Sequence, residues 1–155
     1  MNLDLRKYEK WMRHALTEAI RGFDDGEVPV GAIIVKDNRI IGKGYNQVES
    51  LNDSTAHAEM IAITSASNTN QDWRLDDCFI FVTKEPCPMC AGAILNSRIR
   101  GIIYGLPDEK WGSCGSHYDI CRDNKKSNFP IIIGGVLKDD AQFLMENFFN
   151  KLREK

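Results

Sequence analysis

The sequence predicts an α/β fold, with a mixed sheet of about five strands between helices in three α-β-α layers. Two observations predict this class. Helical and strand patterns alternate along the chain, and 155 residues with 43% hydrophobic content suffice for one globular core. No linker, internal repeat or low-complexity tract divides the chain. We therefore expect residues 1–155 to form a single catalytic domain.

The N-terminal third predicts a helix followed by a β-hairpin. Apolar residues recur at helical spacing over residues 5–23, and Gly26 marks the end of that pattern. Two β-rich runs follow, at residues 28–35 and 39–45. The residues between them, Lys36-Asp37-Asn38, have a composition typical of a turn, which indicates a hairpin.

The rest of the chain alternates between helices and strands. Asp53 and Ser54 are candidate N-caps for a helix that extends to about residue 66. The run 86–95 predicts another helix, because its prolines are tolerated in a first helical turn. The remaining expected elements are strands at 78–83, 99–104 and 131–136, a helix before the last strand, and an amphipathic helix at 139–152.

Two short motifs carry the chemistry of the chain: Ala56-His57-Ala58-Glu59 and Pro86-Cys87-Pro88-Met89-Cys90. One histidine and two cysteines make three ligands, the number that a catalytic zinc keeps when its fourth position stays open. The carboxylate of Glu59 adds a group that can take and return a proton. This H-x-E…P-C-x-x-C order is typical of zinc-dependent base deaminases.

The spacing of these residues predicts where they lie on their helices. Cys87 and Cys90, three apart in a first helical turn, project from the same face and can bind one ion. His57 and Glu59 are only two apart, which inside a helix would send them to nearly opposite sides. They must therefore sit where the chain enters the helix. The predicted site then lies between two helix N-termini, whose dipoles favour thiolates.

The cysteine count leaves one alternative to the metal site. The chain has five cysteines, and an odd count without a secretory signal argues against a disulfide framework. Cys78 is expected to be a buried apolar side chain. Cys114 and Cys121 are too far apart for a second C-x-x-C, which disfavours a four-cysteine zinc site. A thioredoxin-like redox pair at Cys87 and Cys90 is the alternative.

The other two histidines are expected to be structural. His14 lies within the predicted first helix, where the common role is that of a satisfied core residue. His117 lies in a predicted surface segment and is expected to be solvated.

The charge of the N-terminus and the hydropathy of the chain predict the cellular location of the protein. The N-terminus is charged, and no apolar run approaches the roughly 18 residues that a membrane helix needs. We expect a cytoplasmic protein without a membrane segment.

Longer motifs make the chain resemble one known family. From about residue 8 to 152 it is similar to the bacterial tRNA-specific adenosine deaminases of the cytidine deaminase superfamily. The Asp108 to Ser116 pattern, D-x-K-x-G-x-x-G-S, is typical of the tRNA branch. The other matching motifs are Trp11-Met12-Arg13-His14-Ala15-Leu16, Glu27-Val28-Pro29-Val30-Gly31-Ala32, Gly44-Tyr45-Asn46, Thr55-Ala56-His57-Ala58-Glu59-Met60 and Glu85-Pro86-Cys87-Pro88-Met89-Cys90-Ala91-Gly92-Ala93.

The resemblance implies a fold, an activity and partners. The fold is cytidine deaminase-like, with a mixed five-stranded sheet. The activity is hydrolytic deamination of adenosine to inosine at wobble position 34 of tRNA. The cofactor is Zn²⁺, one ion per chain. The partners are the tRNA anticodon stem-loop and a second copy of the chain in a homodimer.

The resemblance also implies a role for each matching residue. Glu59 is the catalytic residue, which moves a proton from water to ring nitrogen N1 and then helps ammonia leave. The base has to leave its stack, so its binding in a tight pocket and the hydrogen bonds to its edge must offset the free energy of unstacking. The implied metal ligands are His57, Cys87 and Cys90, and the implied substrate contacts are Val28 as an apolar wall, Asn46 and the Ala58 amide at the base edge, and Asp108 at the sugar.

Some features depart from the tRNA branch and keep a second interpretation open. Phe129 follows Asn128 where the branch has histidine, Lys84 replaces an apolar residue, and Trp111 adds bulk beside the pocket. The net charge of −2 is unusual for an RNA-binding protein. The alternative is a zinc-dependent deaminase of a free nucleobase or nucleoside, of guanine or cytosine type. A catalytically inactive binding module is disfavoured because every catalytic residue is present.

Basic residues gather in two places that favour RNA. One cluster follows the Asp108 motif and the other lies at the C-terminus, and a merely solvated face is the alternative for both. The clusters are Lys110, Arg122, Lys125 and Lys126, and then Lys151, Arg153 and Lys155.

Overall fold

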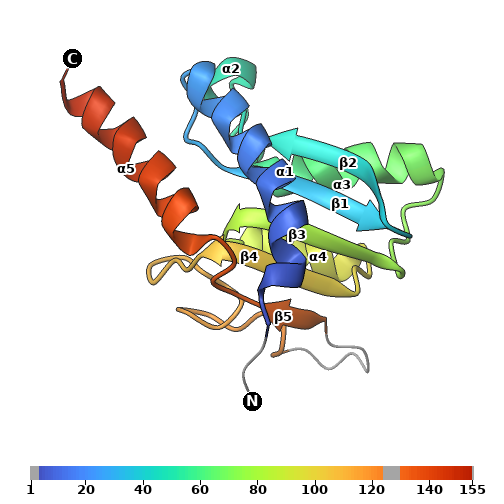
Figure 1. The fold of residues 1–155 in the computed structure, drawn as a ribbon. Helices are drawn as coiled ribbons and strands as arrows, with labels where there is room; N and C mark the ends of the chain where they lie inside the picture. Colours follow the sequence, from blue (N-terminus) through green and yellow to red (C-terminus); the bar gives the residue numbers. More distant parts are fainter. Residues whose placement is uncertain (1–3, 124–129, 155) are drawn as a thin grey trace.

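The computed structural model describes residues 4–123 and 130–154 (Figure 1). Its five strands form one mixed sheet in the order β2-β1-β3-β4-β5. The pairs β1/β2 and β1/β3 are antiparallel, whereas β3/β4 and β4/β5 are parallel. The sheet therefore has the predicted mixed character. The strands are β1 (Gly31–Lys36), β2 (Arg39–Tyr45), β3 (Cys78–Lys84), β4 (Gly101–Leu106) and β5 (Ile131–Ile133).

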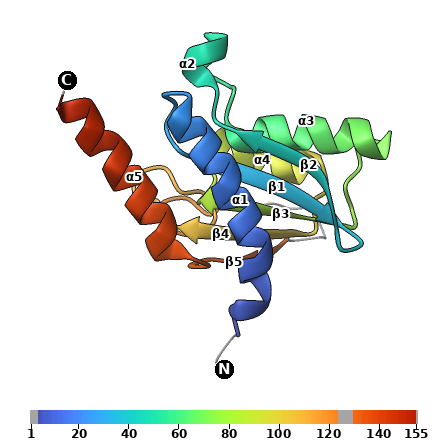
Figure 2. The same cartoon turned by 45° about the horizontal axis from the view of Figure 1, so that its top comes forward.

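Helices cover both faces of this sheet, which confirms the three-layer architecture. Figures 1 and 2 show α1 and α5 on one face and α3 and α4 on the other, with the short α2 at the top of the molecule. Successive side chains of a strand point to opposite faces, so each strand serves two cores. The helices are α1 (Arg6–Asp24), α2 (Val48–Leu51), α3 (Ala58–Asn70), α4 (Pro88–Asn96) and α5 (Lys138–Arg153).

Neighbouring residues of one strand belong to different hydrophobic cores, one on each face of the sheet. On β1, Ile34 packs in the core that includes Ala62 of α3, whereas Ile33 packs in the core that includes Met12 of α1. All four are fully or almost fully buried. This alternation rigidly fixes the sheet against both helix layers, because slipping a strand by one residue would exchange its two faces.

The predicted hairpin forms, with one change at its start. Asp37 and Asn38 both have positive φ, as the two central residues of a type I′ turn require, and Lys36 pairs with Arg39. The first strand begins only at Gly31, so residues 28–30 were wrongly assigned to it. That stretch lies at the mouth of the site described below.

The prediction of Asp53 and Ser54 as N-caps is wrong. Asp53 instead accepts hydrogen bonds from the N–H and hydroxyl of Thr55, at 2.8 and 2.7 Å, and so forms a local turn. The unpredicted α2 precedes this turn, and α3 begins three residues later than a Ser54 cap would require, with His57 at its N-cap position. The Asp53 carboxylate, which a cap would need, is therefore already engaged in local hydrogen bonds.

Three further expectations differ from the structure. Between β4 and β5, the described residues 107–123 contain no helix. The last strand ends at Ile133, short of the predicted residue 136. His14 is exposed and not in the core, whereas His117 is exposed as expected and Cys78 is fully buried.

No helix within the described ranges has the length and apolar character needed to cross a membrane.

Candidate active site

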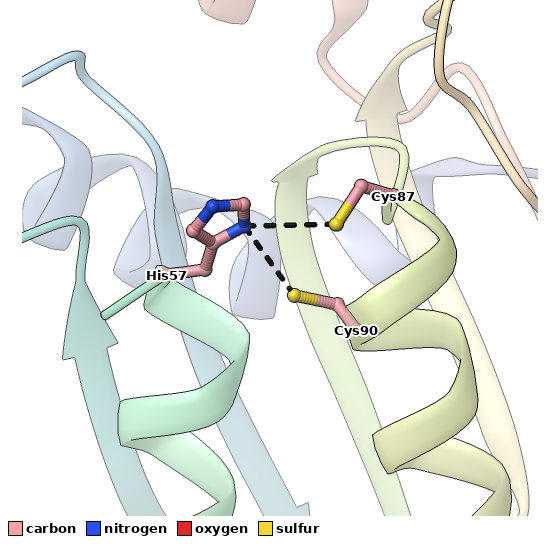
Figure 3. Close-up of side chains that lie close together, drawn as sticks. All are labelled: His57, Cys87 and Cys90. Atoms are coloured by element: carbon pink, nitrogen blue, oxygen red, sulfur yellow. Dashed lines mark hydrogen bonds between the residues drawn. The ribbon is translucent and has the colours of Figure 1, made fainter. Parts of the chain in front are cut away.

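The three predicted metal ligands lie together between two helix N-termini (Figure 3). His57 is the N-cap residue of α3, and Cys87 is the N-cap residue of α4, with Cys90 one turn further along. Neither N-cap side chain caps its own helix. Both are instead directed toward the space between the helices, where the predicted group assembles.

The distances within this group fit a zinc ion. His57 Nδ1 lies 3.6 Å from Cys87 Sγ and 3.6 Å from Cys90 Sγ, and the three ligand atoms all lie within 4.8 Å of one another. Tetrahedral zinc with ordinary Zn–N and Zn–S bonds separates a nitrogen and a sulfur ligand by about 3.6 Å. The donor set and its spacing are therefore those of a zinc site with three protein ligands.

The electrostatics of the group favour one thiolate. A hydrogen bond from the Cys90 side chain lowers the pKa of Cys87 to about 4, and a hydrogen bond from the Cys90 backbone N–H contributes to this lowering. The same hydrogen bond, together with burial, raises the pKa of Cys90. The hydrogen bond to Cys87 raises the pKa of His57. A thiolate at a helix N-terminus is also stabilised by the helix dipole, and thiolate is the form that binds metal.

Glu59 lies beside this group on the first turn of α3. Its side chain is buried, with 4% of the residue exposed, and burial raises the pKa of its carboxyl group. It lines a cavity of about 470 Å³ together with His57 and Cys87. A cavity of this size accommodates a small organic group such as a nucleobase. A buried carboxyl group with a raised pKa is suited to accept and return a proton.

The predicted substrate contacts line the same cavity. Val28 and Ala58 contribute to its wall, Asp108 lies at the end of β4, and Asn46 follows β2. The Asn46 side-chain amide donates to the carbonyl of Val28 at 3.4 Å. Gly44 lets α3 approach, because a Cβ there would lie 2.5 Å from the Ala58 carbonyl oxygen. The close contact of α3 with β2 thus brings Ala58 and Asn46 to one wall.

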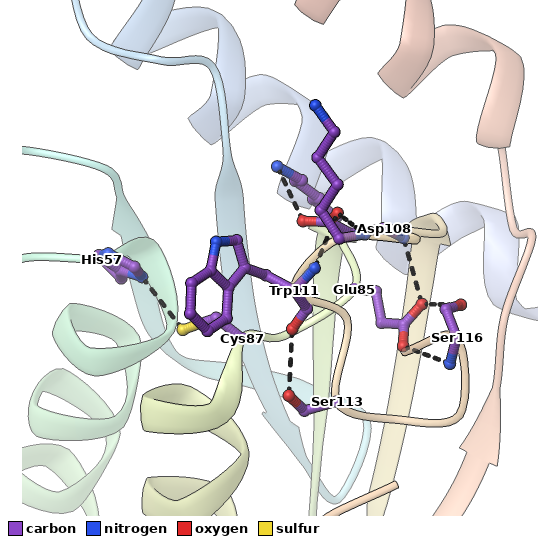
Figure 4. Close-up of polar contacts among 9 residues, drawn as sticks. His57, Glu85, Cys87, Asp108, Trp111, Ser113 and Ser116 are labelled. Carbon is purple, nitrogen blue, oxygen red and sulfur yellow. Dashed lines mark hydrogen bonds and ion pairs between the residues drawn. The ribbon is translucent and has the colours of Figure 1, made fainter. Parts of the chain in front are cut away.

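Glu85 anchors the Asp108 loop, a role that was not predicted from the sequence. Glu85 is buried, and its carboxylate accepts the N–H groups of Asp108 at 3.2 Å, Cys114 at 3.0 Å and Ser116 at 3.2 Å (Figure 4). It also accepts the Ser116 hydroxyl. Gly112 permits this packing, because a Cβ there would lie 2.5 Å from the Glu85 carboxylate. A carboxylate directly after a buried strand was the available signal.

Replacing Glu85 with glutamine tests this anchoring role. Both carboxylate oxygens accept hydrogen bonds, so an amide NH₂ would have to face N–H donors. We expect Glu85→Gln to lower the free energy of unfolding by about 1–3 kcal/mol, because buried donors lose their partner. Denaturant unfolding measures the loss. Glu109→Gln, on the same loop but exposed, is the matched control, and equal stability of the two variants would contradict the role.

Two other contributors to the cavity also went unrecognised. Glu27 is buried and accepts the N–H groups of Glu49 at 2.9 Å and Ser50 at 2.8 Å, which ties α2 to the cavity mouth. Phe148 and Phe149 of α5 also line the cavity. Their amphipathic pattern was visible, but it does not distinguish a face that packs on the sheet from one that borders a cavity.

The residues that depart from the tRNA branch have different positions. Lys84 lines the cavity, whereas Trp111 is 58% exposed and its indole lies 6.2 Å from the ring of Tyr118. Asn128 and Phe129 lie outside the described residues, as do Lys125 and Lys126 of the first basic cluster.

The fold and this site together define a class of protein, a deaminase with the cytidine deaminase-like fold. The chain belongs to the MafB19-like deaminase family, which it matches over residues 6–153. Among relatives, it is 40% identical over all 155 residues to the tRNA-specific adenosine deaminase of Streptococcus pyogenes, of which it covers 98%. Over 108 residues it is 54% identical to the chloroplastic tRNA(adenine(34)) deaminase of Arabidopsis thaliana, covering 70% of this chain but only 8% of that longer protein.

Solved structures give the same family relation. A structure from a study of A-to-I editing by tRNA:A34 deaminases at the wobble position of transfer RNA matches with a TM-score of 0.82 and 36% identity. That match covers 86% of this chain and 96% of the other. The guanine deaminase of Bacillus subtilis matches with a TM-score of 0.62 and 41% identity, covering 69% of this chain and 66% of the other.

Proposed function

We propose that this protein is a zinc-dependent hydrolase that converts adenosine to inosine at wobble position 34 of tRNA. One observation carries the proposal: a buried carboxylate, Glu59, borders the same cavity as a His/Cys/Cys group with zinc spacing. That combination supplies a metal-binding group and a proton carrier next to a space large enough for a base.

The metal site would consist of His57, Cys87 and Cys90, holding one Zn²⁺ per chain. Zinc bound there would lower the pKa of a coordinated water and so supply hydroxide near neutral pH. The protein holds the ligands at two helix N-termini, which stabilises the Cys87 thiolate before any metal binds.

The proton transfers fall to Glu59. Hydrolytic deamination adds oxygen to C6 of adenine and releases ammonia, so one proton must move from water to ring nitrogen N1 and another to the leaving amine. The raised pKa of Glu59 suits a group that is protonated and deprotonated in turn. Asn46 and the Ala58 amide would hold the base edge, Val28 would pack on the ring, and Asp108 would contact the sugar.

The substrate proposal rests on the relatives together with the cavity walls. The full-length relative from Streptococcus pyogenes is a tRNA-specific adenosine deaminase, whereas the guanine deaminase match covers 69% of this chain. The phenylalanines of α5 add aromatic surface beside the cavity, and aromatic side chains stack on unpaired bases. A free nucleobase or nucleoside of guanine or cytosine type is the alternative substrate, and the guanine deaminase match supports the guanine type.

A substrate panel decides between these functions. Purified zinc-loaded protein is incubated with an arginine tRNA anticodon stem-loop and, in parallel, with guanine, cytosine, adenine and their nucleosides, and ammonia release is measured. We expect turnover of the stem-loop with at least tenfold lower kcat/KM for every free base, because the RNA supplies additional binding energy at its backbone. Turnover of guanine or cytosine alone would contradict the proposed substrate.

The assembly and location are proposed from the family resemblance. The chain would form one catalytic domain over residues 1–155, pair as a homodimer and act in the cytoplasm. Analytical ultracentrifugation of the zinc-loaded protein tests the dimer, and a sedimentation coefficient of the monomer at micromolar concentration would contradict it.

A further inference from the structure

The wall of the cavity carries one feature with no role in the proposed chemistry, the ion pair between Lys84 and Asp108. Lys84 ends β3, directly before the segment that leads to Cys87, and Asp108 follows the parallel neighbour β4. The Lys84 ammonium lies 3.2 Å from Asp108 Oδ2. The carboxyl ends of two adjacent parallel strands thus bring the pair to the edge of the sheet where ligands commonly bind.

Asp108 is a rigid member of this pair. Its Oδ1 accepts the N–H groups of Lys110 at 3.0 Å and Trp111 at 3.2 Å, and its own N–H donates to Glu85. Burial opposes ionisation, but the N–H donors and the Lys84 ammonium keep the pKa of Asp108 below its ordinary value. Asp108, which is labelled in Figure 4, therefore stays charged and pairs with the ammonium of Lys84, another residue of the cavity lining.

The Lys84 side chain is partly exposed, and the residue lines the cavity. The Lys84 side chain is 32% exposed, against 15% for that of Asp108. An ammonium group has three donors, and Asp108 accounts for its one ion pair among residues 4–123 and 130–154. Donors thus remain that can serve a ligand oxygen.

The charges around the cavity make Lys84 distinctive. The lining includes several carboxylates, among them Glu49 and Glu59. Within the described part of the chain, Lys84 is the one lysine or arginine of that lining. An anionic group of a substrate can therefore find a favourable partner at Lys84, whereas the carboxylates of the wall would repel it.

We propose that the Lys84–Asp108 pair is a sugar–phosphate subsite, in which Lys84 binds a backbone phosphate beside the nucleotide that is deaminated. The inference rests on the proposed function, in which Asp108 contacts the sugar. Sugar and phosphate are adjacent in a nucleotide, as carboxylate and ammonium are here. The subsite would favour a nucleotide within RNA over a free base or nucleoside, since neither of those carries a phosphate.

The test compares Lys84→Gln with Lys43→Gln, a matched loss of one positive charge at an exposed position of β2 outside the cavity. Zinc-loaded proteins are assayed for binding of the anticodon stem-loop and for inosine formation over a range of salt. We expect Lys84→Gln to weaken binding about tenfold, the worth of one charge-assisted contact. Its salt slope should fall by about 0.7, as for one phosphate contact on a single strand, and Lys84→Arg should restore both.

Assays with smaller substrates show which phosphate Lys84 contacts and whether Lys84 acts directly or by positioning Asp108. Lys84→Gln should leave the KM for free adenosine unchanged, because adenosine has the sugar but no phosphate. A raised KM for adenosine would overturn the subsite and make Lys84 only a positioning residue for Asp108. An effect on 5′- or 3′-adenosine monophosphate without one on the stem-loop would overturn the assignment to the RNA backbone.

The subsite and the proposed function fail in different ways. Wild-type inosine formation on the stem-loop, with equal binding and equal salt slopes for Lys84→Gln and Lys43→Gln, would overturn the subsite alone. Absence of inosine with the wild type would overturn the proposed function and the subsite with it. Circular dichroism and zinc content confirm in each case that the variant is folded and loaded.

Discussion

Replacing Cys87 with alanine is expected to remove zinc and activity together. The variant keeps two protein ligands, His57 and Cys90, and two ligands rarely hold zinc against solvent. Zinc content by elemental analysis should fall from one ion per chain to well below that, and inosine formation should fall below detection. This is the largest effect that we expect from any single substitution.

Cys78→Ala is the matched control for that experiment. Cys78 is also buried and lies at the start of β3, but it takes no part in the metal group. We expect this variant to keep its zinc. A Cys87→Ala protein with a full complement of zinc would show that the ligand assignment is wrong.

Glu59→Ala is expected to separate metal binding from catalysis. Glu59 is not a ligand in the proposed site, so zinc content should stay at one ion per chain. Turnover should fall by about two to four orders of magnitude, the usual contribution of a positioned proton carrier. Single-turnover inosine formation on the stem-loop, alongside zinc analysis, gives both numbers. Activity within a few-fold of wild type would mean that another group carries the proton.

Binding of the stem-loop provides the internal control for Glu59→Ala. If Glu59 acts in the chemical step, the dissociation constant should change little while the rate falls. A parallel loss of binding would point to a collapsed cavity, since the Glu59 side chain is buried and hydrogen-bonded to Cys90.

The metal group could be predicted from the sequence because its geometry is local. Cys87 and Cys90 are three residues apart at a helix start, and the two-residue spacing of His57 and Glu59 requires the same for α3. The order of helical and strand patterns along the chain likewise predicted a mixed five-stranded sheet. In the structure, β1 and β3 do contribute residues to the cores on both faces. Here local rules and the final fold agree.

The loops around the cavity could not be predicted because long-range contacts determine them. Glu85 organises a loop that lies 23 to 31 residues further along the chain, and Glu27 holds α2 across 22 and 23 residues. The Asp53 cap failed for a local reason, because its carboxylate bonds Thr55 instead. Propensity identifies residues that can cap or turn, but competition among partners decides which they do.

In the proposed function, the cavity beside His57, Cys87 and Cys90 deaminates the wobble adenosine of tRNA. The most direct test is to incubate zinc-loaded protein with an arginine tRNA and read inosine position by position through sequencing. We expect inosine at position 34 and at no other adenosine, and no inosine after the zinc is removed by a chelator. Inosine at other positions, none at position 34, or full activity without metal would contradict it.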